Sequence, residues 1–161
     1  MTHPGLVTLG VVLGLGFAAA ASAGEPASSC ATTVASSRAF SEPSPSTASR
    51  FWYGSEELAV LLKTSGRWRG MGPTHDYREK LFWSRQGYSG VAEPQPALTV
   101  SARKLDGEAP PAQVSRATNA HHEDFGGWAM LVTVEFPAAG CWEVTGQYGT
   151  ETLRFVVQVG A

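Results

Sequence analysis

Apolar and polar residues alternate in short stretches from about residue 51 to the end of the chain. The clearest stretch is Trp128–Phe136, whose even-numbered positions hold Trp, Met, Val, Val and Phe. The positions between them hold Ala, Leu, Thr and Glu. Because successive side chains of a β-strand point to opposite faces, this pattern predicts a strand that turns one face toward a core.

Shorter stretches of the same kind predict further strands. Glycine and proline recur between them, and no capped helical pattern interrupts them. The residues from Gly146 to Thr150 predict the turn of a C-terminal hairpin. Many short strands separated by turn residues are typical of an antiparallel β-sandwich or barrel. The further strands are expected at Leu58–Leu62, Leu81–Trp83, Leu98–Arg103, Cys141–Thr145 and Leu153–Val159.

The first 23 residues read as an export signal. An apolar run from Leu6 to Ala23 ends in Ala21-Ser22-Ala23, the small-residue pattern that a signal peptidase accepts. Glycines interrupt the run, which is shorter than the ~20 strongly apolar residues of a membrane span. We therefore expect cleavage before Gly24 and an exported protein, periplasmic or extracellular, with no stable membrane span after cleavage.

The mature chain divides into a leader and one domain. Residues 24–50 are rich in Ser, Ala, Thr and Pro, so they bury too little apolar surface to offset their ordering entropy. We expect a flexible leader there and a single β-sandwich domain over residues 51–161. The formal charge of −2 gives no overall attraction for nucleic acid, so no nucleic-acid partner is expected.

The two cysteines, Cys30 and Cys141, are expected to form a disulfide, because a single pair in an exported chain points to a structural bond. Lipid attachment at Cys30 is disfavoured, since the apolar run ends several residues before it. Cys141 is in phase with Glu143 and opposite to Trp142. The bond is therefore expected to strap the leader over the outer side of the sheet.

The run Phe136-Pro-Ala-Ala-Gly-Cys-Trp-Glu-Val-Thr-Gly146 resembles the next-to-last strand of bacterial immunoglobulin-like domains, in which a Pro/Gly corner precedes a strand with an inward aromatic residue. It also resembles a group of exported bacterial proteins that end in a GCWEVTG hairpin and carry one cysteine near the mature N-terminus. The resemblance covers mainly the last third of the chain. It implies an all-β fold, an antiparallel immunoglobulin-like β-sandwich, and it brings no known activity.

The densest group of metal-ligand side chains is His121-His122-Glu123-Asp124. Imidazoles and carboxylates suit zinc or copper(II). Adjacent residues of a strand point apart, so both histidines could reach one ion only from a loop, which we expect between Pro111 and Gly126. His75 could join them from a second loop. A solvated polar loop is the interpretation that we favour, and a metal site is the alternative.

A second candidate site combines cations with an aromatic ring at Arg67, Trp68 and Arg69. Such a group can stack on sugars or bases and pair with phosphates. The alternative, which we favour, is that the indole packs in the core while the arginines lie on the solvent face. If this surface binds a ligand, an envelope polyanion or glycan suits an exported protein better than nucleic acid does.

Evidence for an enzyme is weaker. Gly87-Tyr88-Ser89-Gly90-Val91 lacks the final glycine of a nucleophile elbow, and the parallel sheet that such an elbow needs is not expected. We therefore expect a non-catalytic domain without a cofactor, with a binding or structural role in the cell envelope. Its partner would be an envelope protein or glycan, and a metal-binding domain is the alternative.

Overall fold

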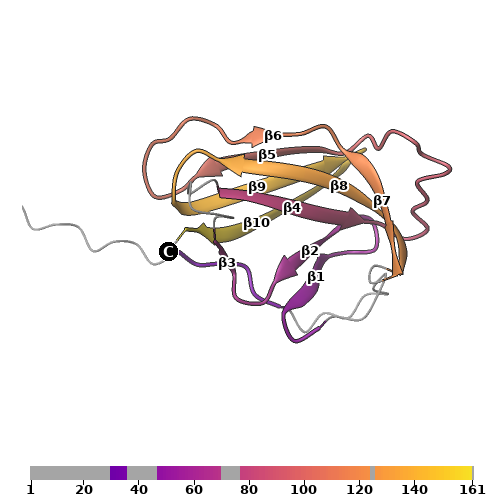
Figure 1. Cartoon of the computed structure of the whole chain (residues 1–161), viewed down its shortest axis with the longest axis horizontal. Coiled ribbons are helices and arrows are strands. Elements are labelled where there is room, and N and C mark those ends of the chain that lie inside the picture. The colour runs from indigo at the N-terminus through magenta and orange to yellow at the C-terminus, as the bar shows by residue number, and fades with distance from the viewer. Residues whose placement is uncertain (1–29, 36–46, 70–76, 124–125, 161) are drawn as a thin grey trace, which may run out of the picture.

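The computed structural model describes residues 30–35, 47–69, 77–123 and 126–160. Within these ranges the chain folds into two β-sheets that lie face to face (Figure 1). The strands are β1 (Arg50–Gly54), β2 (Ala59–Lys63), β3 (Arg67–Trp68), β4 (Tyr77–Ser84), β5 (Thr99–Lys104), β6 (Gln113–Val114), β7 (Thr118–His122), β8 (Gly127–Phe136), β9 (Gly140–Tyr148) and β10 (Glu151–Val159).

One sheet has six strands in the order β1-β2-β4-β8-β6, and β7 pairs with β8 on the same side as β6. The other has four strands in the order β3-β10-β9-β5. All pairs are antiparallel except that of β3 with β10. The expectation of an all-β fold with two sheets is confirmed.

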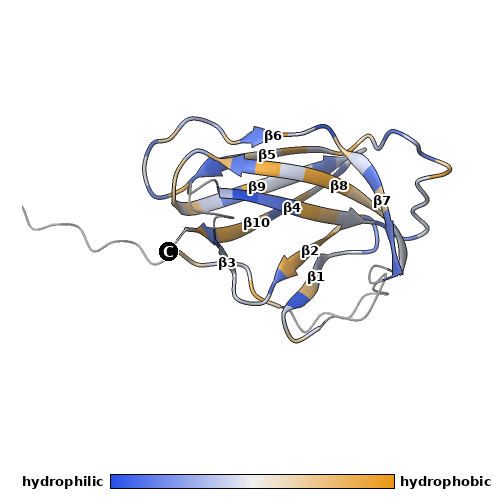
Figure 2. Cartoon of the chain, viewed as in Figure 1, coloured by the Kyte–Doolittle hydropathy of each residue, from blue (hydrophilic) through white to orange (hydrophobic). Residues whose placement is uncertain are grey.

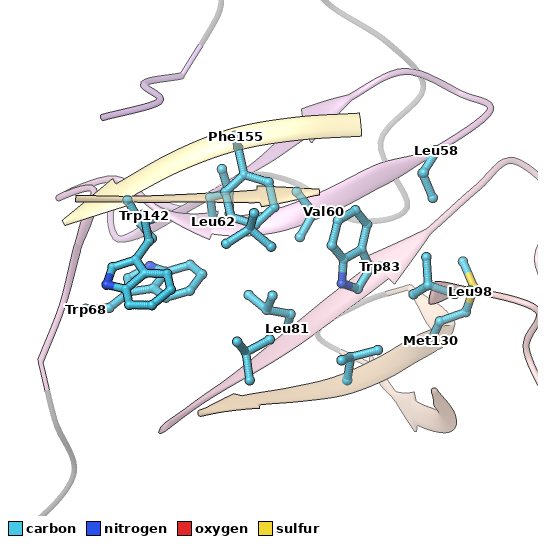
Figure 3. Packing of buried hydrophobic residues seen from close by; sticks show 14 of the residues in the cluster. Leu58, Val60, Leu62, Trp68, Leu81, Trp83, Leu98, Met130, Trp142 and Phe155 are labelled. Atoms are coloured by element: carbon cyan, nitrogen blue, oxygen red, sulfur yellow. The ribbon is translucent and has the colours of Figure 1, made fainter. Parts of the chain in front are cut away.

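The core lies between the sheets and is rich in aromatic side chains (Figure 3). Trp83 and Trp142 are fully buried, and Trp68 packs against Phe136 and Phe155 with ring centroids 5.7 and 6.0 Å apart. In β8 the predicted apolar face is confirmed from Met130 to Phe136, because its four even-numbered side chains are buried. Figure 2 shows the apolar residues alternating with polar ones along the strands.

The C-terminal hairpin is confirmed, but its turn is shorter than expected. β9 continues to Tyr148 and β10 begins at Glu151, and Gly149 takes a positive φ of 59° between them. Gly146 lies inside β9, opposite Leu153. A Cβ at this position would come within 2.3 Å of the Trp83 ring. The glycine is therefore needed to leave space for the buried ring, and it does not form the turn.

The prediction of a loop between Pro111 and Gly126 is wrong, because strands β6 and β7 form there. Both pair with β8, which is ten residues long. β7 has the sequence TNAHH, in which no position is a large aliphatic residue. An edge strand that buries little side-chain surface needs no apolar alternation, so the sequence pattern did not reveal it.

Cys30 and Cys141 form the predicted disulfide across a sequence separation of 111. Residues Cys30–Ala35, here called the N-terminal strap, lie against β10. The N–H of Thr33 donates to the carbonyl of Val156, and the N–H of Val156 donates to Thr33 Oγ1, both at 2.9 Å. A disulfide points to an oxidising, extracytoplasmic compartment. In the described ranges, no helix has the length and apolar character needed to cross a bilayer.

Candidate binding site

Two open hollows lie along the outer edge of β5. The first part, about 500 Å³, lies between residues 94–100 and residues 114–118. The second part, about 650 Å³, lies between residues 102–104 of β5 and residues 107–111. Each volume falls in the range of roughly 300–1,000 Å³ that is common for ligand sites. We call the two parts together the β5 groove, and its far side, residues 107–118, the groove wall.

The backbone of β5 turns hydrogen-bonding groups toward this groove. The N–H of Leu105, one residue past the strand, donates to the carbonyl of Cys141 at 2.7 Å. In an antiparallel pair, hydrogen-bonded and non-bonded positions alternate. The odd-numbered residues of β5 therefore bond to β9, and the N–H and C=O groups of Val100, Ala102 and Lys104 point to the groove.

The side chains of the same even-numbered residues point toward the sandwich interior. Val100 and Ala102 are half-buried and pack against the core, as do Ala109 and Val114 across the groove. All four of these residues are apolar and line the two parts of the groove. The floor of the groove is therefore apolar, and its β5 side carries backbone donors and acceptors.

A polar network fixes the loop between β4 and β5, which forms one end of the groove. The hydroxyl of Tyr148 donates to Glu93 Oε2, and the N–H of Ala97 donates to Glu93 Oε1 at 2.8 Å. Asn119 Nδ2 donates to the backbone carbonyl of Glu93 at 2.8 Å. One acidic residue thus joins the loop to β7 and to the β9–β10 hairpin.

Two tyrosines and an arginine complete the network. The hydroxyl of Tyr88 donates to Asn119 Oδ1, and Arg85 Nε donates to the hydroxyl of Tyr148 at 3.2 Å. The Arg85 guanidinium also lies 5.9 and 5.4 Å from the ring centroids of Tyr88 and Tyr148. These contacts hold the loop that carries Pro94 and Pro96, both of which line the groove.

The environment keeps both phenols protonated. Burial raises the pKa of Tyr88 to about 12, and the nearby Glu93 carboxylate adds to the rise while Arg85 opposes it. Burial, and then the hydrogen bond to Glu93, raise the pKa of Tyr148. Both hydroxyls therefore remain donors to a higher pH than those of exposed tyrosines.

Four charged residues line the groove: Arg103, Lys104, Glu108 and Arg116. Arg103 pairs with Glu143 at 2.8 Å, and Lys104 pairs with Asp106 at 2.8 Å. Arg116, on the wall, is exposed, and none of the ion pairs within the described ranges includes it. The groove therefore offers one unneutralised cation, at the end near Thr99.

The predicted histidine group is placed on β7 rather than on a loop. His121 and His122 are adjacent in this strand, opposite Trp128 and Gly127, so their side chains point to opposite faces. The ring of His121 lies edge-on to that of Trp128, with centroids 4.8 Å apart. His75 lies outside the described residues. Among the described residues, no three or more His, Cys, Asp or Glu side chains are placed so that they could hold one metal ion.

The predicted cation and aromatic group at Arg67, Trp68 and Arg69 is divided between surface and core. Trp68 is only 3% exposed and belongs to the aromatic core, whereas both arginines are exposed. The indole ring is therefore closed to a ligand in this structure. The two arginines remain available as surface cations.

The sequence did not indicate the residues that build the groove. Asn119 and Glu93 stand in no motif, and Tyr148 lies within the segment Gly146–Thr150 that was predicted to be the turn of the C-terminal hairpin. Pro94-Gln95-Pro96 was a visible signal, since prolines beside a strand mark a segment that cannot pair with it. No protein-family model matches the chain, and no curated protein or solved structure compared with it is similar.

Proposed function

We propose that this protein is an exported, non-catalytic binding domain of the cell envelope and that it binds an envelope protein or glycan in the β5 groove. The observation that carries the proposal is the groove itself, with an apolar floor, one side of backbone donors and acceptors, and an end fixed by the Glu93 network. The apolar run of the first 23 residues and the disulfide support export.

We further propose that the sandwich is immunoglobulin-like. The proposal is supported by the orders β2-β4-β8-β7 and β5-β9-β10, which correspond to the orders A-B-E-D and C-F-G of immunoglobulin constant-type sheets. In this correspondence the groove runs beside strand C, at the edge where variable-type domains add further strands. Domains of this architecture serve many unrelated functions, so the binding role depends on the groove and not on the fold.

Hydrogen exchange of the exported protein tests the binding proposal. The outward amides of Val100, Ala102 and Lys104 are expected to exchange quickly in the free protein and more slowly when soluble envelope extract is added. The amides of Thr99 and Ser101, which bond to β9, serve as internal controls because they are already protected. An extract that protects no amide in residues 94–118 would count against the proposal.

A matched pair of variants sharpens this test. Ala102→Arg places a long side chain in the groove, whereas Ser101→Arg places the same side chain on the outer face of the same strand. Only Ala102→Arg is expected to abolish the protection by extract. Thermal unfolding of both variants checks that each is folded. Equal protection in the two variants would place the ligand elsewhere.

A further inference from the structure

In the four-stranded sheet, the sides of β10 and β5 that face away from β9 are covered very differently. Along β10, the N–H groups of Val156, Gln158 and Gly160 donate in turn to Thr33 Oγ1, the carbonyl of Gly66 and the carbonyl of Trp68, at 2.8 to 2.9 Å. This side is covered by the N-terminal strap and β3. By contrast, β5 pairs with β9 on one side, and no other strand within the described ranges pairs with its other side.

The open edge carries the groups that an additional strand would need. The N–H and C=O groups of Val100, Ala102 and Lys104 point outward, which is the alternating pattern that a sheet edge offers to another chain. The groove wall does not pair with β5: residues 107–111 form no strand and include Pro110 and Pro111, which have no N–H, and the wall strands β6 and β7 pair with β8 instead.

The groove floor defines which side chains an added strand would carry. Every second side chain of such a strand would face the interior, over Val100, Ala102 and Val114, all half-buried against the core. The others would face solvent. An alternation of apolar and polar residues therefore matches the groove, whereas a uniformly polar chain would leave the floor open to water.

The charged residues of the groove favour an added strand that carries a carboxylate. Arg116 lies at the Thr99 end of the groove and makes no ion pair within the described ranges, whereas Arg103 and Lys104 at the other end are already neutralised. A carboxylate at the Arg116 end would therefore meet the one uncompensated cation. It would also gain from the planar, two-donor geometry of the guanidinium.

We propose that β5 accepts an extended segment of a partner protein as the next strand of the four-stranded sheet. The segment alternates apolar and polar residues and carries a carboxylate at the Arg116 end. This inference rests on the proposed groove function and names its ligand class. A second copy of the chain is disfavoured as the occupant, because its own β5 has the sequence TVSARK and offers no carboxylate to Arg116.

Synthetic peptides test the inference on the unmodified protein. The probe is an acetylated peptide of about eight residues that alternates threonine and valine and ends in glutamate; a second probe carries the glutamate at the start, because strand direction is open. Binding is expected to protect the amides of Val100, Ala102 and Lys104. The matched control is the same peptide with N-methyl groups at alternate residues, in both phases, which removes the donors facing β5.

Variants of the protein test the two recognition elements separately. Ala102→Pro removes one outward N–H and keeps the bonds to β9, a position where an edge strand accepts proline. It is expected to weaken peptide binding about fivefold or more, the effect of one lost hydrogen bond. Arg116→Glu is expected to weaken binding of the peptide that carries glutamate. The affinity of the analogue with glutamine in its place is expected to change by no more than about twofold.

The outcomes are distinguishable. Equal binding of the N-methylated and unmodified peptides, or no protection by any peptide, would overturn strand addition. If envelope extract still protects the same amides, the groove binds another ligand such as a glycan, and the proposed function stands. If extract fails as well, both proposals fall. Protection that rises with protein concentration alone would identify a second copy as the occupant. Should Ala102→Pro not fold, the N-methylated peptides decide the question.

Discussion

Removal of the disulfide should separate two contributions to the stability of this fold. We consider the variant Cys30→Ala/Cys141→Ala, in which alanine avoids placing a hydroxyl at the buried Cys141 position. In the wild type the crosslink restricts the unfolded chain, and it also holds the N-terminal strap on β10. The loss of stability in the variant therefore depends on whether the strap stays docked without the crosslink.

The size of the effect follows from the structure. The cysteines are 111 residues apart, and in the chain-entropy model a loop of about 100 residues is worth about 4.7 kcal/mol. Docking an uncrosslinked strap closes the loop from Cys30 to about Thr47, which costs about 3 kcal/mol for roughly 15 residues. The two hydrogen bonds between Thr33 and Val156 offset about 2 kcal/mol of this cost. Release of the strap is then favoured by about 1 kcal/mol, and the variant should lose between about 3 and 4 kcal/mol.

Urea unfolding of both proteins without reductant, followed by tryptophan fluorescence, measures this loss. Hydrogen exchange at the Val156 amide reports strap release directly, and this amide should lose protection in the variant while the Gln158 amide, bonded to Gly66, keeps it. Thr33→Ala, with the disulfide intact, is the control that removes only one strap contact. A loss below about 3 or above about 5 kcal/mol would refute the loop-closure reasoning, since a fully released strap gives a loss of about 3.7 kcal/mol and a fully docked strap about 4.7 kcal/mol.

Three further results are expected. Gly146→Ala should lower the free energy of unfolding by about 1–3 kcal/mol in urea, because its Cβ would lie 2.3 Å from the fully buried Trp83 ring; an unchanged midpoint would show that the ring can move. Tyr88 has a folded pKa of about 12, above the unfolded value, so its contribution is fully present below about pH 10 and is lost as pH rises toward 12. Urea unfolding of Tyr88→Phe across this range should therefore show a weaker fall in stability than the wild type, and equal slopes would contradict this. Titration with copper(II) or zinc should leave the unfolding temperature unchanged, since His121 and His122 diverge on β7; a concentration-dependent rise would support the alternative metal-binding function.

The sequence predicted the parts of the fold in which burial alternates strictly. β8, β9 and β10 each bury one face against the other sheet, so their apolar positions recur with a period of two. The disulfide was predictable because only two cysteines are present and an apolar run that resembles an export signal precedes them. In both cases one dominant interaction determines the residue type at each position.

Elements defined by pairing alone were not predictable. β7 and β3 contribute few core side chains, and their positions are set by backbone bonds to β8 and β10. The sequence therefore could not show that His121 and His122 lie on a strand. The Glu93 network was hidden for a related reason, because its members come from a loop, a strand and a hairpin that only the tertiary fold brings together.

The contrast between these sides of β10 and β5 also limits what can bind at β5. The strap makes two hydrogen bonds with Val156 of β10, one of them through the Thr33 side chain, which are too few to offset its ordering entropy, so it needs a covalent bond. A partner segment at β5 has no such bond and must gain more from its contacts. Its backbone can meet three outward-facing residues, but each hydrogen bond is worth only about 1 kcal/mol net. Burial of apolar side chains over Val100 and Ala102 must therefore supply much of the remaining free energy, at about 25 cal/mol per Å². For this reason the alternation of the partner's side chains, more than its backbone, should determine which segments the groove accepts.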